Sequence, residues 1–208
     1  MKVWSESFAD GRPLPERLAF GRIDPASHVA HAGNRSPHLA WRDLPAATAS
    51  LAIVCHDPDV PSRPDDVNQE GRTIPADLPR VEFFHWALVD LDPAFGQIAE
   101  GVFSDGVTPG GKDGPEGPLG TRQGLNGYTQ WFAGDPEMAG DYFGYDGPCP
   151  PWNDSIVHHY VFTIYALDVR RCPVEGRFDG PALRAAIEGH VLAETRLTGT
   201  YTLNPALG

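Results

Sequence analysis

Glycine and proline constrain this chain more than any other feature of its sequence. The 208 residues include 23 glycines and 21 prolines, together about a fifth of the chain, whereas globular proteins average roughly 12%. Both residues disfavour helix interiors and favour turns. The spacing has no collagen-like period, and aromatic residues make up 10% of the chain, which argues against a disordered low-complexity protein. The sequence therefore predicts a mostly β protein with ordered loops and few helices.

Short apolar runs predict the main strands of this β protein. Each run is four to ten residues long, rich in β-branched and aromatic residues, and bounded by turn-forming residues. The segment Asp57-Pro58-Asp59-Val60-Pro61 ends the first run and predicts a loop, because proline interrupts a sheet ladder. The expected strands lie at residues 51–57, 83–89, 159–167 and 198–203.

One helix and one long irregular region complete the prediction. Residues 181–192 place apolar side chains along one helical face, and Pro181 suits the first turn, so a C-terminal helix is expected. Between residues 101 and 147 glycine recurs without periodicity, yet aromatic residues occur among the polar ones. This composition predicts ordered loops that carry function. No linker or internal repeat divides the chain, so residues 1–208 are expected to form a single domain.

The charge balance excludes several classes of partner. The chain has 16 basic and 28 acidic residues, a net charge of −12, and no basic run, so neither a nucleic acid nor an anionic membrane surface is an expected partner. The apolar stretch Leu51–Cys55 is far too short to span a bilayer, and Met1–Ser5 lacks the apolar centre of a signal peptide. Three cysteines cannot all pair within the chain, which favours reduced thiols and a cytoplasmic protein.

Familiar catalytic and cofactor motifs do not fit. Residues 106–112 have P-loop spacing, but Asp113 replaces the hydroxyl residue that would hold magnesium, and the glycines and prolines that follow cannot form the required helix. The chain has no zinc-type spacing and no nucleophile elbow. Cys149 lies among prolines and is more typical of an apolar filler than of a reactive thiol. No cofactor is expected.

Histidines at the strand ends give the richer signal. Because side chains alternate along a strand, His158 and Tyr160 share one face, while His159 points to the other. Asp57 lies on the inner face of its strand, and His85 interrupts an apolar strand, where an imidazole is costly unless hydrogen-bonded. Two interpretations remain open from the residues alone: structural side chains that are hydrogen-bonded, and a metal site, although no spacing here is diagnostic of one.

Five motifs in series resemble the phosphatidylethanolamine-binding protein family, which includes the Raf kinase inhibitor proteins, and most closely its bacterial branch. The resemblance extends from about Ser36 to Tyr201. The motifs are Ser36-Pro37-His38-Leu39-Ala40-Trp41, Asp57-Pro58-Asp59-Val60-Pro61-Ser62, His85-Trp86-Ala87-Leu88, Gly144-Tyr145-Asp146-Gly147-Pro148-Cys149-Pro150-Pro151 and His158-His159-Tyr160-Val161-Phe162.

The resemblance implies a β-sandwich with a large antiparallel sheet, few helices and a small anion-binding pocket at one end. Imidazole N–H groups, a phenol and the Gly147 N–H would donate hydrogen bonds to the anion. Binding is then expected to strengthen as the pH falls towards 6 and the histidines protonate. The implied ligand-binding residues are Asp57, Pro61, His85, Gly147, Pro148, His158 and Tyr160.

A non-catalytic protein that binds a small anionic ligand, such as phosphate, phosphoethanolamine or a carboxylate, is the function that the resemblance implies. Regulation of a partner protein and homodimer formation are further expectations. Two alternatives remain: an enzyme that uses the same residues for acid/base hydrolysis of a phosphoester or ester, and a protease or kinase inhibitor. The insert at residues 105–143 is of the bacterial kind and has no counterpart in kinase-inhibitor members, so kinase inhibition is not expected to transfer.

Overall fold

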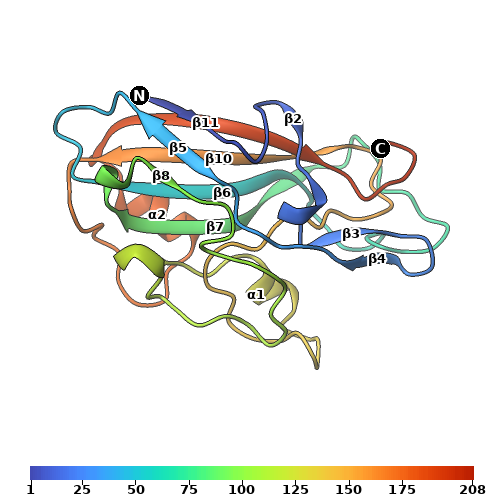
Figure 1. The fold of residues 1–208 in the computed structure, drawn as a ribbon. Coiled ribbons are helices and arrows are strands. Elements are labelled where there is room, and N and C mark those ends of the chain that lie inside the picture. The colour runs from blue at the N-terminus through green and yellow to red at the C-terminus, as the bar shows by residue number, and fades with distance from the viewer.

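Four long strands form the centre of the protein, whose computed structural model describes residues 1–208 (Figure 1). They belong to a six-stranded sheet in which all neighbours are antiparallel except the parallel pair β2 and β11. In sheet order the strands are β2 (Arg12–Pro13), β11 (Val191–Tyr201), β10 (His158–Leu167), β6 (Ser50–Pro61), β7 (Arg80–Leu91) and β9 (Arg122–Gln123).

A smaller sheet covers one face of the large sheet. Its strands are β1 (Lys2–Trp4), β5 (Leu39–Arg42) and β8 (Gln97–Ile98). Strands β3 (Gly21–Asp24) and β4 (His28–His31) form a separate hairpin. Leu39 and Trp41 of the small sheet pack with Ile53 and Phe162 of the large one in the main core. The predicted mostly β sandwich is therefore confirmed, although the large sheet is mixed at its β2 edge.

The C-terminal helix covers the other face of the large sheet. Helix α2 (Gly180–Ala186) buries Leu183 in a second core with Val54 of β6 and Tyr165 of β10. The alternation of side chains thus feeds two cores, one on each face. The remaining helical segments are short: η1 (Glu16–Leu18), η2 (Pro93–Phe95), η3 (Pro118–Gly120) and α1 (Tyr128–Trp131). None of the helices combines the length and apolar character needed to cross a bilayer.

The helix predicted over residues 181–192 is too long. It ends at Ala186, and Gly189 then adopts a left-handed conformation with φ +83°, which turns the chain into β11. That strand begins at Val191 rather than at residue 198. The apolar residues after Gly189 satisfy helical spacing by coincidence and alternate along a strand instead.

The predicted loop at Asp57–Pro61 is also wrong, because β6 continues through Pro61. The register with β7 shifts between Asp57 and Val60, so the chain forms a bulge that leaves Pro58 outside the regular ladder. On its other side β6 pairs with β10 only as far as His56, so no ladder bond is lost there. An unpaired edge tolerates the prolines that a central strand would not.

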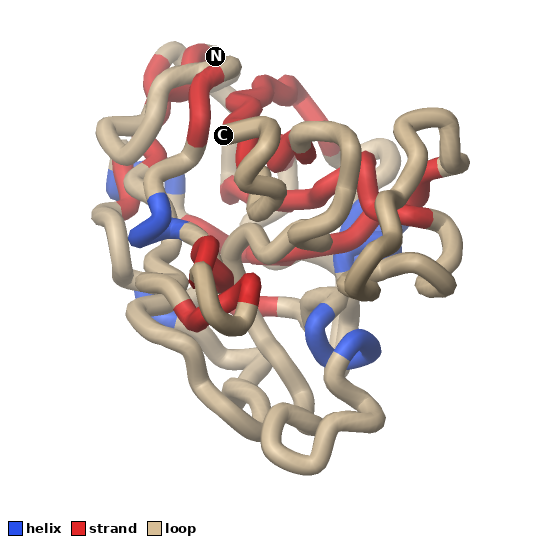
Figure 2. Tube along the Cα trace, turned by 90° about the vertical axis from the view of Figure 1, so that its right-hand side faces the viewer, coloured by secondary structure: helices blue, strands red, loops and turns tan.

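The irregular region between residues 101 and 147 is ordered, as predicted. It lies below the strands in Figure 1, and Figure 2 shows the same side of the molecule built mainly of loops. Tyr128, Met138 and Tyr142 of this region form a small buried cluster together with Phe20 from the N-terminal part of the chain. Aromatic packing, rather than regular backbone pairing, therefore orders this region.

Candidate functional site

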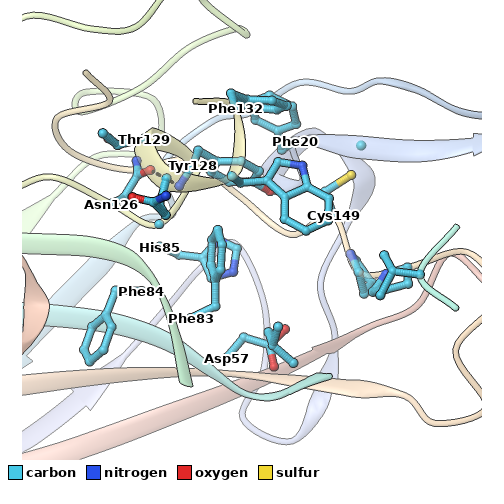
Figure 3. Close-up of a pocket in the computed structure, with 18 of the residues that line it drawn as sticks. Phe20, Asp57, Phe83, Phe84, His85, Asn126, Tyr128, Thr129, Phe132 and Cys149 are labelled. Atoms are coloured by element: carbon cyan, nitrogen blue, oxygen red, sulfur yellow. Dashed lines mark hydrogen bonds between the residues drawn. The ribbon is translucent and has the colours of Figure 1, made fainter. Parts of the chain in front are cut away.

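A cavity of about 1020 Å³ lies at the end of the large sheet where β6 and the first residues of β7 and β10 meet. Its floor carries polar side chains, among them Asp57 from β6, His85 from β7, and His158 and Tyr160 from β10. The loop after Pro61 and the helix α1 form its rim. Figure 3 shows Asp57 and His85 on the strand side and Tyr128, Phe132 and Phe20 on the opposite side.

Four charged groups alternate in sign at this floor: three are buried and the fourth, Arg80, is half-buried. His158 Nδ1 lies 2.8 Å from Asp57 Oδ2, and His158 Nε2 lies 3.1 Å from Asp154 Oδ2. Arg80 donates to both oxygens of Asp154, at 2.5 and 3.0 Å. Both nitrogens of His158 therefore have carboxylate partners, and neither is free for a ligand.

The two carboxylates hold His158 in its charged form. Burial alone would lower the pKa of His158, but the hydrogen bonds and charges of Asp154 and Asp57 outweigh it and raise the pKa to about 9. His158 is thus an imidazolium at neutral pH. Its positive charge is neutralised within the protein rather than offered to the cavity.

His85 presents the opposite chemistry. Its Nδ1 lies 2.8 Å from the carbonyl oxygen of Asp146, which can only accept, so Nδ1 carries the hydrogen. Burial lowers the pKa of His85, and the neutral ring then has a lone pair on Nε2. This nitrogen has no partner in the protein, and the ring lines the cavity (Figure 3). His85 therefore offers an acceptor at neutral pH and a donor once protonated.

The hydroxyl of Tyr160 is the one floor group with no hydrogen bond. It is buried, and the side chain is 1% exposed. Burial and the nearby negative charge of Asp57 raise the pKa of Tyr160 well above its usual value, so the hydroxyl keeps its hydrogen. Leaving such a group unpaired costs about 1–3 kcal/mol, so the hydroxyl is available to donate to a group that enters the cavity.

Asp146 holds the segment behind His85 in place. Its fully buried carboxylate accepts from Lys112 Nζ at 2.8 Å and from the side-chain amides of Asn34 and Asn126 at 2.7 Å each. Lys112 also donates to the carbonyl of Tyr145. Residues from the insert and from the N-terminal part of the chain thus converge on the Asp146 carboxylate. The backbone carbonyl of the same residue fixes His85.

Stacked aromatic rings form the far wall. Phe20 stacks on Tyr128 at 4.5 Å between ring centroids, and Tyr128 on Phe132 at 5.4 Å. The Tyr128 hydroxyl donates to the carbonyl of Gly147 at 2.8 Å, which fixes the middle ring. The insert therefore builds one wall of the cavity.

Several known proteins are similar to this chain in sequence over nearly its whole length. The sequence profile described as phosphatidylethanolamine-binding protein matches residues 4–202. The UPF0098 protein YbhB of Escherichia coli (strain K12) is 30% identical over 202 residues, which cover 97% of this chain and 100% of YbhB. The chain belongs to the phosphatidylethanolamine-binding protein family. A UPF0098 protein of Chlamydia muridarum is 31% identical over 97% of this chain and 98% of its own.

Solved structures of this family agree with the fold. The crystal structure of E. coli YbcL, described as a new member of the mammalian PEBP family, has a TM-score of 0.68 at 24% identity over 97% of both chains. The structure of CT736 from Chlamydia trachomatis has a TM-score of 0.62 at 28% identity over 96% of this chain and 95% of that one. The resemblance to the bacterial branch is confirmed, and family membership implies an anion-binding pocket.

The structure brings five of the seven expected site residues to the cavity. Gly147 and Pro148 lie behind the lining. The Gly147 N–H, expected to face an anion, donates to Asn34 Oδ1 at 2.8 Å, and the Pro148 carbonyl accepts from Phe20 and Gly21. Those that line the cavity are Asp57, Pro61, His85, His158 and Tyr160.

Sequence reasoning missed two residues that organise the site. Asp154 lies four residues before His158, and Asp146 lies inside the Gly-Tyr-Asp-Gly-Pro motif, so proximity to the motifs was the available signal. Cys149 does line the cavity, but burial raises the pKa of its thiol to about 12, which fits the apolar filler rather than a nucleophile.

The charge on His158 makes the protein's stability depend on pH. The pKa is about 9 in the folded protein against 6.5 for a free side chain, so the stabilisation is complete below pH 6.5 and lost as pH rises through 9. We expect the free energy of unfolding in urea to fall by about 3 kcal/mol over this window. His158→Gln should lose this dependence on pH, and His190→Gln, a half-buried control that is paired with Asp168 outside this network, should keep it. An NMR titration of His158 with a midpoint near 6.5 would contradict the assignment.

Removing the ammonium beside Asp146 should strongly destabilise the protein. Lys112→Met leaves a fully buried carboxylate without its counter-charge, and we expect a loss of about 3 kcal/mol or more in urea unfolding. Lys2→Met is the matched control, since Lys2 is exposed in β1. Adding Asp146→Asn to Lys112→Met should recover part of the loss. Equal stability of the two lysine variants would show that the buried pair contributes nothing.

Proposed function

We propose that this protein is a ligand-binding protein that holds a small phosphate-bearing or other anionic ligand in the cavity at the end of the large sheet. One observation carries the proposal: the buried Tyr160 hydroxyl has no partner and lies on the same floor as His85. A ligand oxygen bound there would accept from Tyr160. Family membership supports the same class of ligand.

The binding energy comes from local contacts rather than from long-range attraction. The protein has a net charge of −12, and Arg63 is the only arginine or lysine that lines the cavity. His158 is already paired with two carboxylates, so of the histidines on the floor it is His85 that can gain a proton towards the cavity as the pH falls. A phosphoethanolamine head group would also carry an ammonium, which the Asp57 carboxylate could accept.

The proposed setting is the cytoplasm. The three cysteines form no disulfide, and two of them, Cys55 and Cys172, are buried. Unpaired thiols are typical of proteins in reducing compartments. The cavity thiol of Cys149 also supports a binding role, since a thiol with a pKa of about 12 is a poor nucleophile at neutral pH.

Titration with O-phosphoethanolamine by isothermal calorimetry tests the proposal. Tyr160→Phe should weaken binding about tenfold, because it removes one donor to a charged oxygen, and His85→Ala should weaken it further. Binding should strengthen from pH 8 to pH 5.5, because a bound anion raises the pKa of His85 and draws in a proton. Tyr165→Phe, on the other face of the sheet, is the control. Unchanged affinity in both pocket variants would contradict the site.

An enzyme is the second candidate, favoured by the Nε2 lone pair of His85. A neutral imidazole held by Nδ1 against a carbonyl has the form of a general base. A panel of phosphoesters and carboxylic esters, tested on the natural protein and on His85→Ala, separates the two functions. We expect no turnover with either protein. Turnover that His85→Ala abolishes would establish the enzyme and overturn the non-catalytic proposal.

A further inference from the structure

The floor of the cavity is richer in acceptors than an anion site normally is. His85 turns a lone pair towards the ligand, because its Nδ1 hydrogen is held by the Asp146 carbonyl. The Asp57 carboxylate lines the same floor and can only accept. Tyr160 is the single floor group with a free hydrogen to donate.

The charges around His85 do not force a proton onto it. Asp57 on β6 is paired with the imidazolium of His158 on β10, and Asp146 is paired with Lys112 of the insert. The other ionisable groups beside the ring, Tyr128 of α1 and Tyr160 of β10, have strongly raised pKa values and stay neutral. Burial keeps the ring neutral, because it lowers the pKa of His85 by more than Asp57 and Asp146 raise it. The hydrogen bond to the Asp146 carbonyl then places the single ring hydrogen on Nδ1 and leaves Nε2 as the acceptor.

Two kinds of oxyanion differ in how they meet this floor. A fully ionised oxyanion places its own lone pairs against those of His85 and Asp57, which leaves buried acceptors unpaired. An oxyanion that keeps an acidic hydrogen donates it to Nε2 and accepts from Tyr160 with a second oxygen. Inorganic phosphate keeps at least one hydrogen near neutral pH, whereas a phosphate monoester, with a second pKa of about 6, keeps its hydrogen in about half of the molecules at pH 6.

We infer that the pocket selects oxyanions that retain an acidic hydrogen, namely hydrogen phosphate and singly ionised phosphate monoesters, over fully ionised oxyanions of the same shape, such as sulfate. This rests on the proposed function, since it specifies the ligand class of that site. Discrimination between these tetrahedral ions comes from the acceptors His85 Nε2 and Asp57 rather than from size. Sulfate gains a second donor, besides Tyr160, only when His85 itself is protonated.

Calorimetric titrations with inorganic phosphate and sulfate at equal ionic strength test the inference. Inorganic phosphate keeps at least one hydrogen at pH 7.5 and sulfate keeps none, so phosphate should bind about tenfold tighter or more. At pH 5.5 the gap should narrow, because protonated His85 donates to sulfate. Equal affinity at pH 7.5 would overturn the selectivity, whereas binding of neither ion would overturn the proposed function.

Variants assign the selectivity to its atoms. His85→Gln offers either a carbonyl or an amide hydrogen, so the difference between phosphate and sulfate should shrink to about twofold or less at pH 7.5. Tyr160→Phe should weaken both ions alike and leave their ratio unchanged, and it removes only a hydroxyl that has no partner. His190→Gln, outside the cavity, should behave as the natural protein does. Full selectivity in His85→Gln would overturn the role of Nε2.

Discussion

The Asp146 carboxylate is the group on which the site's geometry depends. It is fully buried and accepts hydrogen bonds from Lys112, Asn34 and Asn126, which come from the insert and from the N-terminal third of the chain. A buried carboxylate is costly unless its oxygens are paired in this way. Because its backbone carbonyl also binds His85, the segments that satisfy the carboxylate determine which nitrogen of His85 faces the ligand.

A second charge network fixes the strands below the ligand without making the cavity positive. Asp57, His158, Asp154 and Arg80 alternate in sign and link β6, β10 and β7. Because these charges cancel locally, the network provides rigidity rather than attraction for an anion. The protein as a whole repels anions, so affinity depends on oriented single groups, and recognition is sensitive to the protonation of His85.

Much of the fold could be predicted from the sequence, because apolar alternation identifies the strands that feed the two cores. The end of α2 could not, since residues after Gly189 fit both helical and strand spacing and only the left-handed glycine decides. The motifs identified His85 and Tyr160, and the structure places both in the cavity. Their hydrogen-bond partners were not predictable: nothing in the spacing indicates that Asp154 charges His158 or that Asn34 takes the Gly147 N–H.

The excess of glycine first indicates turns, but at the site it serves close contact. Gly147 is not a turn residue in a left-handed conformation; a Cβ atom there would overlap the carbonyl oxygen of Leu18. Any side chain would push the Gly-Pro segment away from η1 and move the Asp146 carbonyl that precedes it. The tautomer of His85 therefore depends on the absence of a side chain at Gly147. This is a constraint of packing, which turn propensity does not describe.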